Sequence, residues 1–201
     1  MGLHRYTTSE YLNFKWFIKR LFSGKSELDK LISEFIKTKI KKRSIILNIG
    51  AGYWTPYDKY LKNKSKKIYN IDTSMFVRIF RIFNCKRLVL DDKNIYEIIN
   101  YYKIDTITSF HSISFIHINL PKLIKFCTKN NIRFLFDWSV QSDLMIKYNI
   151  SKFCYGQSKY EIFELIKTHN LNIEDISNQS RVTTMDQIYE GGRYLVYTSS
   201  N

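Results

Sequence analysis

The sequence predicts an α/β protein with a mostly parallel sheet of seven strands and one antiparallel strand at its C-terminal end. After residue 43, short apolar runs alternate with segments of helical periodicity, as in parallel sheets that carry helices on both faces. The last two apolar runs, residues 171–177 and 193–198, are joined by a polar stretch without a helical pattern. A parallel neighbour needs a crossover of about a dozen residues or more, usually helical, so this direct return predicts an antiparallel hairpin.

Apolar periodicity and turn residues place the individual elements along the chain. Strands are expected at residues 44–49, 67–71, 87–90, 106–110, 132–136, 171–177 and 193–198. Helices are expected to begin near Pro56, Ser74, Lys93 and Leu120, with a further helix over residues 158–169. This order leaves one helix between each pair of successive parallel strands.

Residues 1–43 form a basic and aromatic extension before the first strand. They carry eleven Lys and Arg against four Asp and Glu, a net +7, which is half of the chain's net charge of +14. Two helices are predicted here, residues 9–22 and 26–39, which either pack on the sheet or grip a substrate. We expect one domain, in which this extension is attached to an α/β domain of residues 44–201.

Several classes of protein are excluded by composition. No stretch approaches the roughly 20 apolar residues of a membrane span, and charges interrupt the N-terminal segment too often for a secretory signal. The three cysteines are odd in number and far apart, which predicts reduced thiols and neither disulfides nor a metal site. A cytoplasmic protein that does not bind membranes is expected.

A glycine turn follows the first strand in the stretch SIILNIGAGYWTPYDKYL, residues 44–61. Gly50 and Gly52 match the first two positions of the dinucleotide pattern G-x-G-x-x-G, but Thr55 occupies the third. Thr55, Pro56 and Asp58 are typical of a helix start, as the N-cap, the first helical residue and an acid in the first turn. The turn alone leaves open a dinucleotide site, a site for another ligand, and a turn that binds nothing.

The same stretch resembles the first motif of the class I, Rossmann-like S-adenosylmethionine-dependent methyltransferases. That motif runs apolar-apolar-acidic-apolar-Gly-x-Gly-x-Gly, and residues 46–54 follow it with two departures. Asn48 replaces the acidic residue and Trp54 replaces the third glycine. The resemblance extends over residues 44–200, because the family's sheet also ends in a helix and an antiparallel hairpin. It implies an enzyme that transfers a methyl group from S-adenosylmethionine.

The resemblance also implies a set of cofactor-binding residues at the ends of the first three strands. Asp72 ends the second strand, where one carboxylate can accept hydrogen bonds from both ribose hydroxyls. The family keeps an acidic side chain near the adenine amino group after its third strand, where this chain has Asp91 and Asp92; either one could instead cap the next helix. The full set is Asn48, Gly50, Ala51, Gly52, Tyr53, Asp72, Asp91 and Asp92.

His111 is the candidate catalytic residue because it follows the fourth strand, next to the expected acceptor. It would act as a general base or contact the cofactor, and the alternative is a packing or capping residue. Asp137 and Trp138, after the fifth strand, are candidates for lining the acceptor pocket. The chain has only two prolines, at positions 56 and 121, and neither lies in an Asn/Asp-Pro-Pro-aromatic or a Pro-Cys motif. These motifs of base methyltransferases are therefore excluded, and the acceptor is unassigned.

The basic extension favours nucleic acid as a partner, RNA before DNA. Lysines neutralise phosphates, and aromatic rings stack on unpaired bases. The competing explanations are compositional bias with a solvated helix face, an acidic protein, and a small-molecule acceptor.

Two other functions remain open at this point. A nicotinamide (NAD(P))-dependent oxidoreductase is supported by Gly50, Gly52 and Asp72. A degenerate methyltransferase fold that only binds nucleic acid or a partner is suggested by Asn48, Trp54 and the charge.

Overall fold

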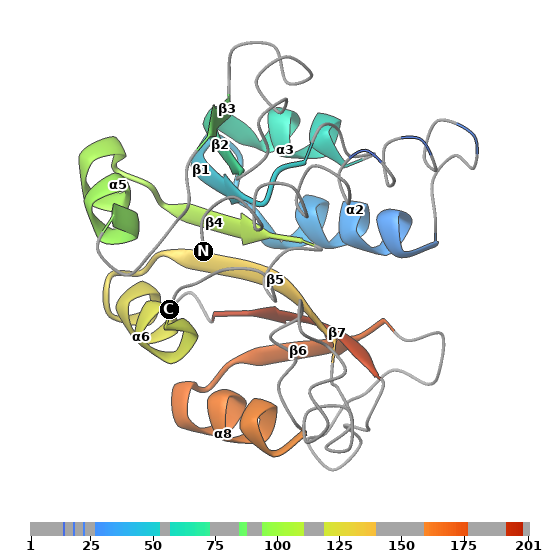
Figure 1. Ribbon diagram of the computed structural model, residues 1–201, viewed down its shortest axis with the longest axis vertical. Helices are drawn as coiled ribbons and strands as arrows, with labels where there is room; N and C mark the ends of the chain where they lie inside the picture. The colour runs from blue at the N-terminus through green and yellow to red at the C-terminus, as the bar shows by residue number, and fades with distance from the viewer. Residues whose placement is uncertain are drawn as a thin grey trace. The chain divides into compact units, whose positions relative to one another are not determined.

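The computed structural model describes residues 14, 18, 22, 27–52, 57–72, 85–87, 94–110, 119–139, 159–176 and 192–198 (Figure 1). The predicted α/β class is confirmed. The strands form a seven-stranded sheet with the order β3-β2-β1-β4-β5-β7-β6. The chain divides into two compact units, residues 1–106 and 107–201. The assignment of residues 1–43 and 44–201 to an extension and a domain stays a prediction.

The first unit holds the glycine turn. Its elements are α2 (Glu27–Lys39), β1 (Ser44–Ile49), α3 (Asp58–Lys64), β2 (Ser65–Asp72), β3 (Cys85–Arg87) and α5 (Asn94–Tyr102). β1 and β2 are parallel, with Asn48 opposite Asn70 and Ile49 opposite Ile71. β3 is parallel to β2 and pairs with its last three residues. The carboxyl ends of β1 and β2 therefore meet at one edge of the sheet.

α2 corresponds to the second helix predicted in the N-terminal extension, residues 26–39, and is amphipathic. Ile32, Phe35 and Ile36 are buried at helical spacing, while acidic residues occupy the first turn and lysines the last. Of the first predicted helix, the structure describes Phe14, Ile18 and Phe22, which are helical and 57%, 37% and 86% exposed. These three side chains are therefore exposed to solvent to different degrees, Phe22 most of all.

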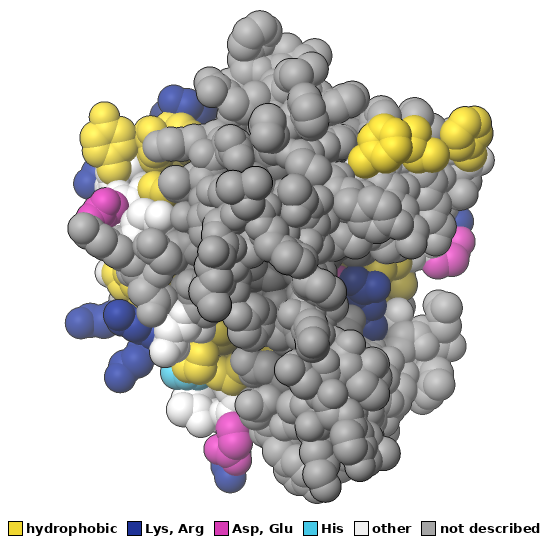
Figure 2. Space-filling view, viewed as in Figure 1, with side chains coloured by type: hydrophobic (Ala, Val, Ile, Leu, Met, Phe, Trp, Pro, Cys, Tyr) yellow, Lys and Arg dark blue, Asp and Glu magenta, His cyan; other side chains and the backbone are white. Residues whose placement is uncertain are grey.

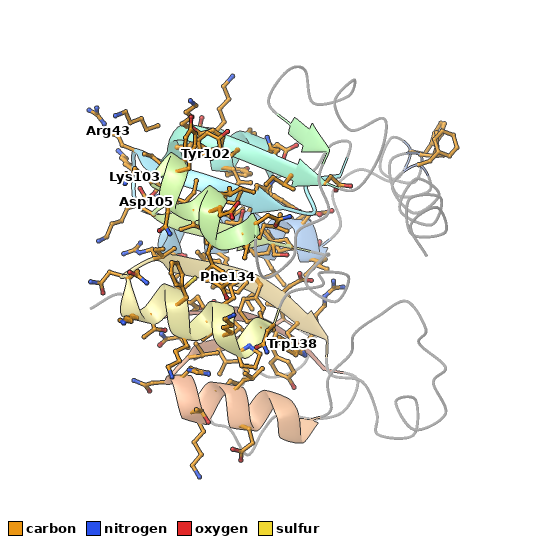
Figure 3. All side chains as sticks on the ribbon, turned by 60° about the vertical axis from the view of Figure 1, so that its left-hand side comes forward. Arg43, Tyr102, Lys103, Asp105, Phe134 and Trp138 are labelled. Carbon is orange, nitrogen blue, oxygen red and sulfur yellow. The ribbon has the colours of Figure 1, made fainter. Side chains whose placement is uncertain are left out.

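The second unit contains the antiparallel end of the sheet. β4 (Thr106–Ser109) spans the boundary between the units, and the later elements are α6 (Leu120–Lys129), β5 (Arg133–Ser139), α8 (Lys159–His169), β6 (Asn172–Asp175) and β7 (Arg193–Tyr197). β7 is antiparallel to both β5 and β6, so the predicted hairpin is confirmed. On β5, the rings of Phe134, Phe136 and Trp138 follow one another at centroid distances of 4.7 and 5.6 Å (Figure 3).

Cys127 on α6 is a buried free thiol, as expected for a reduced protein. Burial raises the pKa of its thiol to about 12, because a thiolate is poorly solvated there.

Exposed hydrophobic side chains lie beside Lys and Arg side chains at the upper left of Figure 2. Within the described part of the chain, no helix is long and apolar enough to cross a membrane.

Gly192, directly before β7, has no room for a side chain. A Cβ atom there would lie 2.3 Å from the hydroxyl oxygen of Tyr194, which is fully buried. We expect Gly192→Ala to lower the free energy of unfolding by about 1–3 kcal/mol, because the trapped ring has to move. Urea denaturation checks this, and Gly192→Ala with Tyr194→Phe should recover part of the loss. An unchanged midpoint for Gly192→Ala would contradict the prediction.

Candidate functional site

The turn after β1 is held closed by backbone hydrogen bonds to the end of β2. The N–H groups of Gly50 and Ala51 both donate to the carbonyl oxygen of Ile71, at 2.8 and 3.2 Å. Gly50 and Gly52 have φ values of 65° and 60°, in the left-handed region that favours glycine. Both glycines are therefore required by the shape of the turn.

Asp72 supplies the next contact of the turn. Its carboxylate oxygen Oδ2 accepts a hydrogen bond from the N–H of Gly52 at 2.8 Å. The residue is 6% exposed, at the last position of β2. This bond joins the acid directly to the glycine turn. Two predicted site residues, twenty positions apart in the chain, are thus in contact.

Asn48 lies beneath the turn, in the sheet itself. Its side-chain Nδ2 donates to Oδ1 of Asn70 at 2.8 Å, and the two residues are 2% and 8% exposed. Buried amides need partners, and the register of β1 and β2 places these two opposite each other. The Asn48 side chain therefore links β1 to β2 two residues before the turn. A contact of this side chain with the cofactor stays a prediction.

Asn70 and the carbonyl group of Ile71 were not predicted as part of the site from the sequence. Asn70 precedes Asp72 by two residues, as Asn48 precedes Gly50 by two. This repeated spacing in neighbouring strands was the available signal for the pair.

The helix after the turn begins later than predicted. The N-cap residue of α3 is Tyr57, which makes no side-chain capping bond, and the first helical residue is Asp58. The predicted start near Pro56 is two residues early, and Thr55 and Pro56 lie outside the described residues. Asp58 thus places a carboxylate at the N-terminal end of α3, where it disfavours a bound phosphate.

The other predicted site residues cannot be placed. Tyr53, Asp91, Asp92 and His111 lie outside the described residues, as does Trp54. Their roles stay predictions. The predicted cofactor-site residues that the structure does bring together are Asn48, Gly50, Ala51, Gly52 and Asp72.

Asp137 and Trp138 were predicted to follow the fifth strand. They lie within it instead, because β5 continues to Ser139. Asp137 is 3% exposed, and its Oδ2 accepts hydrogen bonds from Nε and Nη2 of Arg193 on β7, at 3.1 and 2.6 Å. The Arg193 side chain is 33% exposed. This ion pair across β5 and β7 was missed, since no local pattern links residues 56 positions apart.

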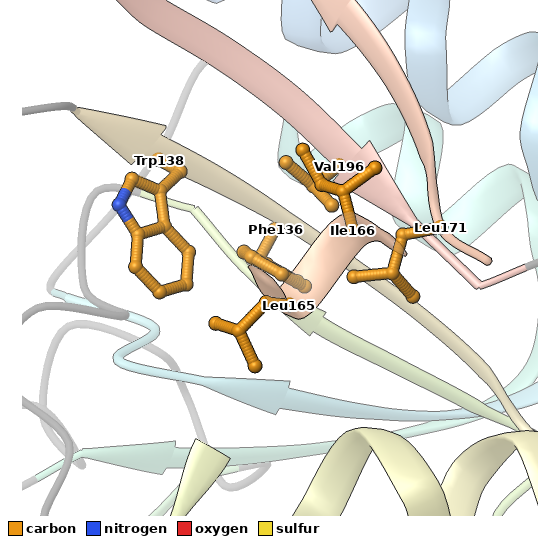
Figure 4. Close-up of a pocket in the computed structure, with 6 residues that line it drawn as sticks. All are labelled: Phe136, Trp138, Leu165, Ile166, Leu171 and Val196. Carbon is orange, nitrogen blue, oxygen red and sulfur yellow. The ribbon is translucent and has the colours of Figure 1, made fainter. Parts of the chain in front are cut away.

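Trp138 contributes to a small apolar pocket between the sheet and α8 (Figure 4). The side chains that line it are those of Phe136, Trp138, Leu165, Ile166, Leu171 and Val196. Five of the six are aliphatic or phenyl groups, and Trp138 itself is 5% exposed. Among the described residues, this recess is a gap in core packing whose lining is apolar, and none of them offers a charged group to orient a substrate.

Comparison with known proteins gives matches in structure only: no family model and no curated protein matches the sequence. Phosphoethanolamine N-methyltransferase 2 of Haemonchus contortus, in complex with phosphomonomethylethanolamine and S-adenosylhomocysteine, is similar with a TM-score of 0.59 and 11% identity. A methyltransferase from Archaeoglobus fulgidus has a TM-score of 0.51 and 11% identity, over 92% of this chain and 98% of that one. Geranyl diphosphate C-methyltransferase from Streptomyces coelicolor A3(2) has a TM-score of 0.51 and 12% identity, over 87% of this chain and 81% of that one.

The chain has the class I methyltransferase fold. The match to the Haemonchus contortus enzyme covers 98% of this chain but 59% of that one, so this chain spans less than two thirds of that enzyme's length. In open α/β sheets, ligands bind outside the carboxyl ends of the strands. The glycine turn and Asp72 of this methyltransferase fold lie at two such ends.

Proposed function

We propose that this chain is an S-adenosylmethionine-dependent methyltransferase that binds its cofactor at the glycine turn after β1. The observation that carries the proposal is the bond from the Gly52 N–H to the buried carboxylate of Asp72. It holds an acid against a glycine turn at the carboxyl edge of the sheet, in a methyltransferase fold. The three similar structures named above are all methyltransferases.

The residues of the turn fit an adenosyl ligand better than a dinucleotide. A dinucleotide site directs backbone N–H groups and a helix N-terminus at a pyrophosphate. Here the N–H groups of Gly50, Ala51 and Gly52 are bonded to β2, and Asp58 adds a negative charge at the start of α3. S-adenosylmethionine has no pyrophosphate. This difference favours a methyltransferase over the NAD(P)-dependent oxidoreductase.

Asp72 would hold the ribose of the cofactor. An ionised carboxylate has about four acceptor sites, so it can accept ribose hydroxyls as well as the N–H of Gly52. Gly50 and Gly52 carry no side chains, which lets the ligand approach the backbone. The cofactor, once bound, supplies an electrophilic methyl group. Much of the remaining catalysis is placement of the acceptor, with His111 as the proposed base where a proton must leave.

The acceptor stays unassigned. Among the similar structures, one carries phosphomonomethylethanolamine and another geranyl diphosphate, so the fold alone does not select an acceptor. For this chain we propose nucleic acid as the acceptor, RNA before DNA, because residues 1–43 carry half of the net charge of +14 among aromatic residues.

Thermal denaturation with four ligands tests the proposal. Adenosylhomocysteine at about 100 times its dissociation constant should stabilise the protein by about 2.7 kcal/mol. For a chain of this size, that raises the melting temperature by about 5–10 °C. S-adenosylmethionine should act likewise, while NAD and NADP should give no shift. A shift with NAD or NADP alone would overturn the proposal in favour of an oxidoreductase. No shift with any of the four would favour the degenerate fold.

A further inference from the structure

A basic and aromatic surface lies at the amino ends of β1, β2 and β4, at the opposite end of β1 from the glycine turn. We call it the amino-edge surface. Its members are Lys42, Arg43, Lys66, Lys67, Tyr69, Tyr101, Tyr102 and Lys103. Backbone pairing brings them together. Ser44 lies opposite Ser65, and the N–H of Asp105 donates to the carbonyl of Ile45 at 3.1 Å. The residues just before Ser44 and Asp105 therefore share one edge with the start of β2 (Figure 3).

Three tyrosines form the centre of this surface. The rings of Tyr69 on β2 and Tyr102 at the end of α5 lie 4.1 Å apart, tilted by 31°. Tyr101 meets Tyr102 edge to face, at 4.8 Å. Tyr101 is 79% exposed, although apolar rings are usually covered. Its ring contacts Tyr102 and is otherwise largely exposed, so it is available to a ligand.

Basic side chains surround the tyrosines. The Lys67 Nζ atom lies 4.8 Å from the ring centre of Tyr69, and the hydrogen bond to the tyrosine raises the pKa of this lysine. Lys66 is an extra residue where the register between β1 and β2 shifts, because Ser44 lies opposite Ser65 and Ile45 opposite Lys67. Lys66 and Lys67 are both exposed at the start of β2. All five basic residues of the surface are exposed.

The acidic residues nearby do not balance this charge. Two are described here, Glu97 on α5 and Asp105, against the five basic residues, which leaves a net +3. Asp105 is also occupied by the chain itself. Its Oδ2 accepts the N–H of Ile45 at 2.9 Å, and its Oδ1 accepts the Thr106 hydroxyl at 2.7 Å. The surface is therefore complementary to an anion.

We propose that the amino-edge surface binds single-stranded nucleic acid. Lysines and Arg43 would contact successive phosphates, and Tyr101 would stack on an unpaired base. A duplex keeps its bases stacked on one another, and an acidic protein lacks flat bases, so neither uses the exposed ring. The six residues of β1 separate this surface from the glycine turn by roughly 20 Å. The surface is thus distinct from the proposed cofactor site and does not depend on methyl transfer.

Fluorescence anisotropy with a labelled single-stranded RNA of twelve nucleotides tests the proposal on the full chain. Tyr101→Ala should weaken binding about 5- to 150-fold, the range for loss of one stacked base, while Tyr101→Phe should bind like wild type. Lys66→Ala with Lys103→Ala should reduce the slope of log affinity against log salt by about 1.4, since each phosphate contact contributes about 0.7. The matched control is Lys30→Ala with Lys125→Ala, two exposed lysines within α2 and α6.

Each outcome has a defined meaning. No binding at low salt, or equal losses in the matched control, would overturn the proposal. So would equal binding of Tyr101→Ala and wild type, or equal affinity for polyglutamate and RNA, because both would indicate an unspecific charge effect. Thermal shifts with adenosylhomocysteine should be the same in all these variants. Failure of this inference is therefore distinguishable from failure of the proposed methyltransferase function.

Discussion

Replacing Arg193 with alanine should lower the free energy of unfolding by about 3 kcal/mol. The substitution removes the two N–H donors that Arg193 offers to the almost fully buried carboxylate of Asp137. Breaking a buried ion pair costs about 3–5 kcal/mol, and the one-third exposure of Arg193 places this pair at the lower end. Urea denaturation of the variant and the wild type, with equal slopes, would measure the loss.

Two further variants separate the ion pair from general effects of the substitution. Arg193→Lys keeps a positive charge but cannot present two N–H groups in a fixed plane, so it should be intermediate. Asp137→Asn combined with Arg193→Ala should recover stability relative to Arg193→Ala alone, because no buried charge remains. If the double variant were no more stable than Arg193→Ala, the pair would not be the cause.

Asp72→Ala should weaken the binding of adenosylhomocysteine by about 10- to 150-fold for each ribose bond that is lost. This range corresponds to about 1.5–3 kcal/mol for a hydrogen bond to a charged group. The variant should also be less stable by about 1–3 kcal/mol, because the N–H of Gly52 loses its acceptor. Titration calorimetry measures the affinity, and thermal denaturation without ligand measures the stability.

Asp105 provides a matched control for Asp72. Its carboxylate accepts the N–H of Ile45 at 2.9 Å, just as Asp72 accepts that of Gly52 at 2.8 Å, but at the amino ends of the strands. Asp105→Ala should lose a comparable backbone contact and keep its affinity for adenosylhomocysteine. Unchanged affinity in Asp72→Ala would show that the ribose is held elsewhere.

Much of the fold could be predicted from the sequence where local pattern and final environment agree. The limits of β1 match the predicted residues 44–49, because an apolar run buried in a parallel sheet ends sharply at a glycine turn. α8 begins within one residue of its predicted start for a similar reason, as its apolar residues recur at helical spacing. The antiparallel pairing of β6 and β7 was predictable because the sequence between them lacks a helical pattern.

Errors occur where strand pairing decides the structure. β2 starts at Ser65 and β5 ends at Ser139, beyond their apolar runs, because a neighbouring strand can order polar residues as well. In the candidate site, the glycines and Asp72 were predictable from spacing and from resemblance. The pairing of Asn48 with Asn70 depends on register, and that of Asp137 with Arg193 on strand order. Neither the register nor the strand order can be predicted from a local segment of the sequence.

The position of β7 also determines when the second unit can be completed during synthesis. β7 lies between β5 and β6 and pairs with both, although it follows both along the chain. Contacts between residues so far apart in sequence form slowly, since the intervening chain must first be ordered. While only the residues up to 175 have left the ribosome, the strand edges of β5 and β6 that β7 later covers are exposed. Such edges attract other strands, so this unit should depend on chaperones until its last strand has left the ribosome.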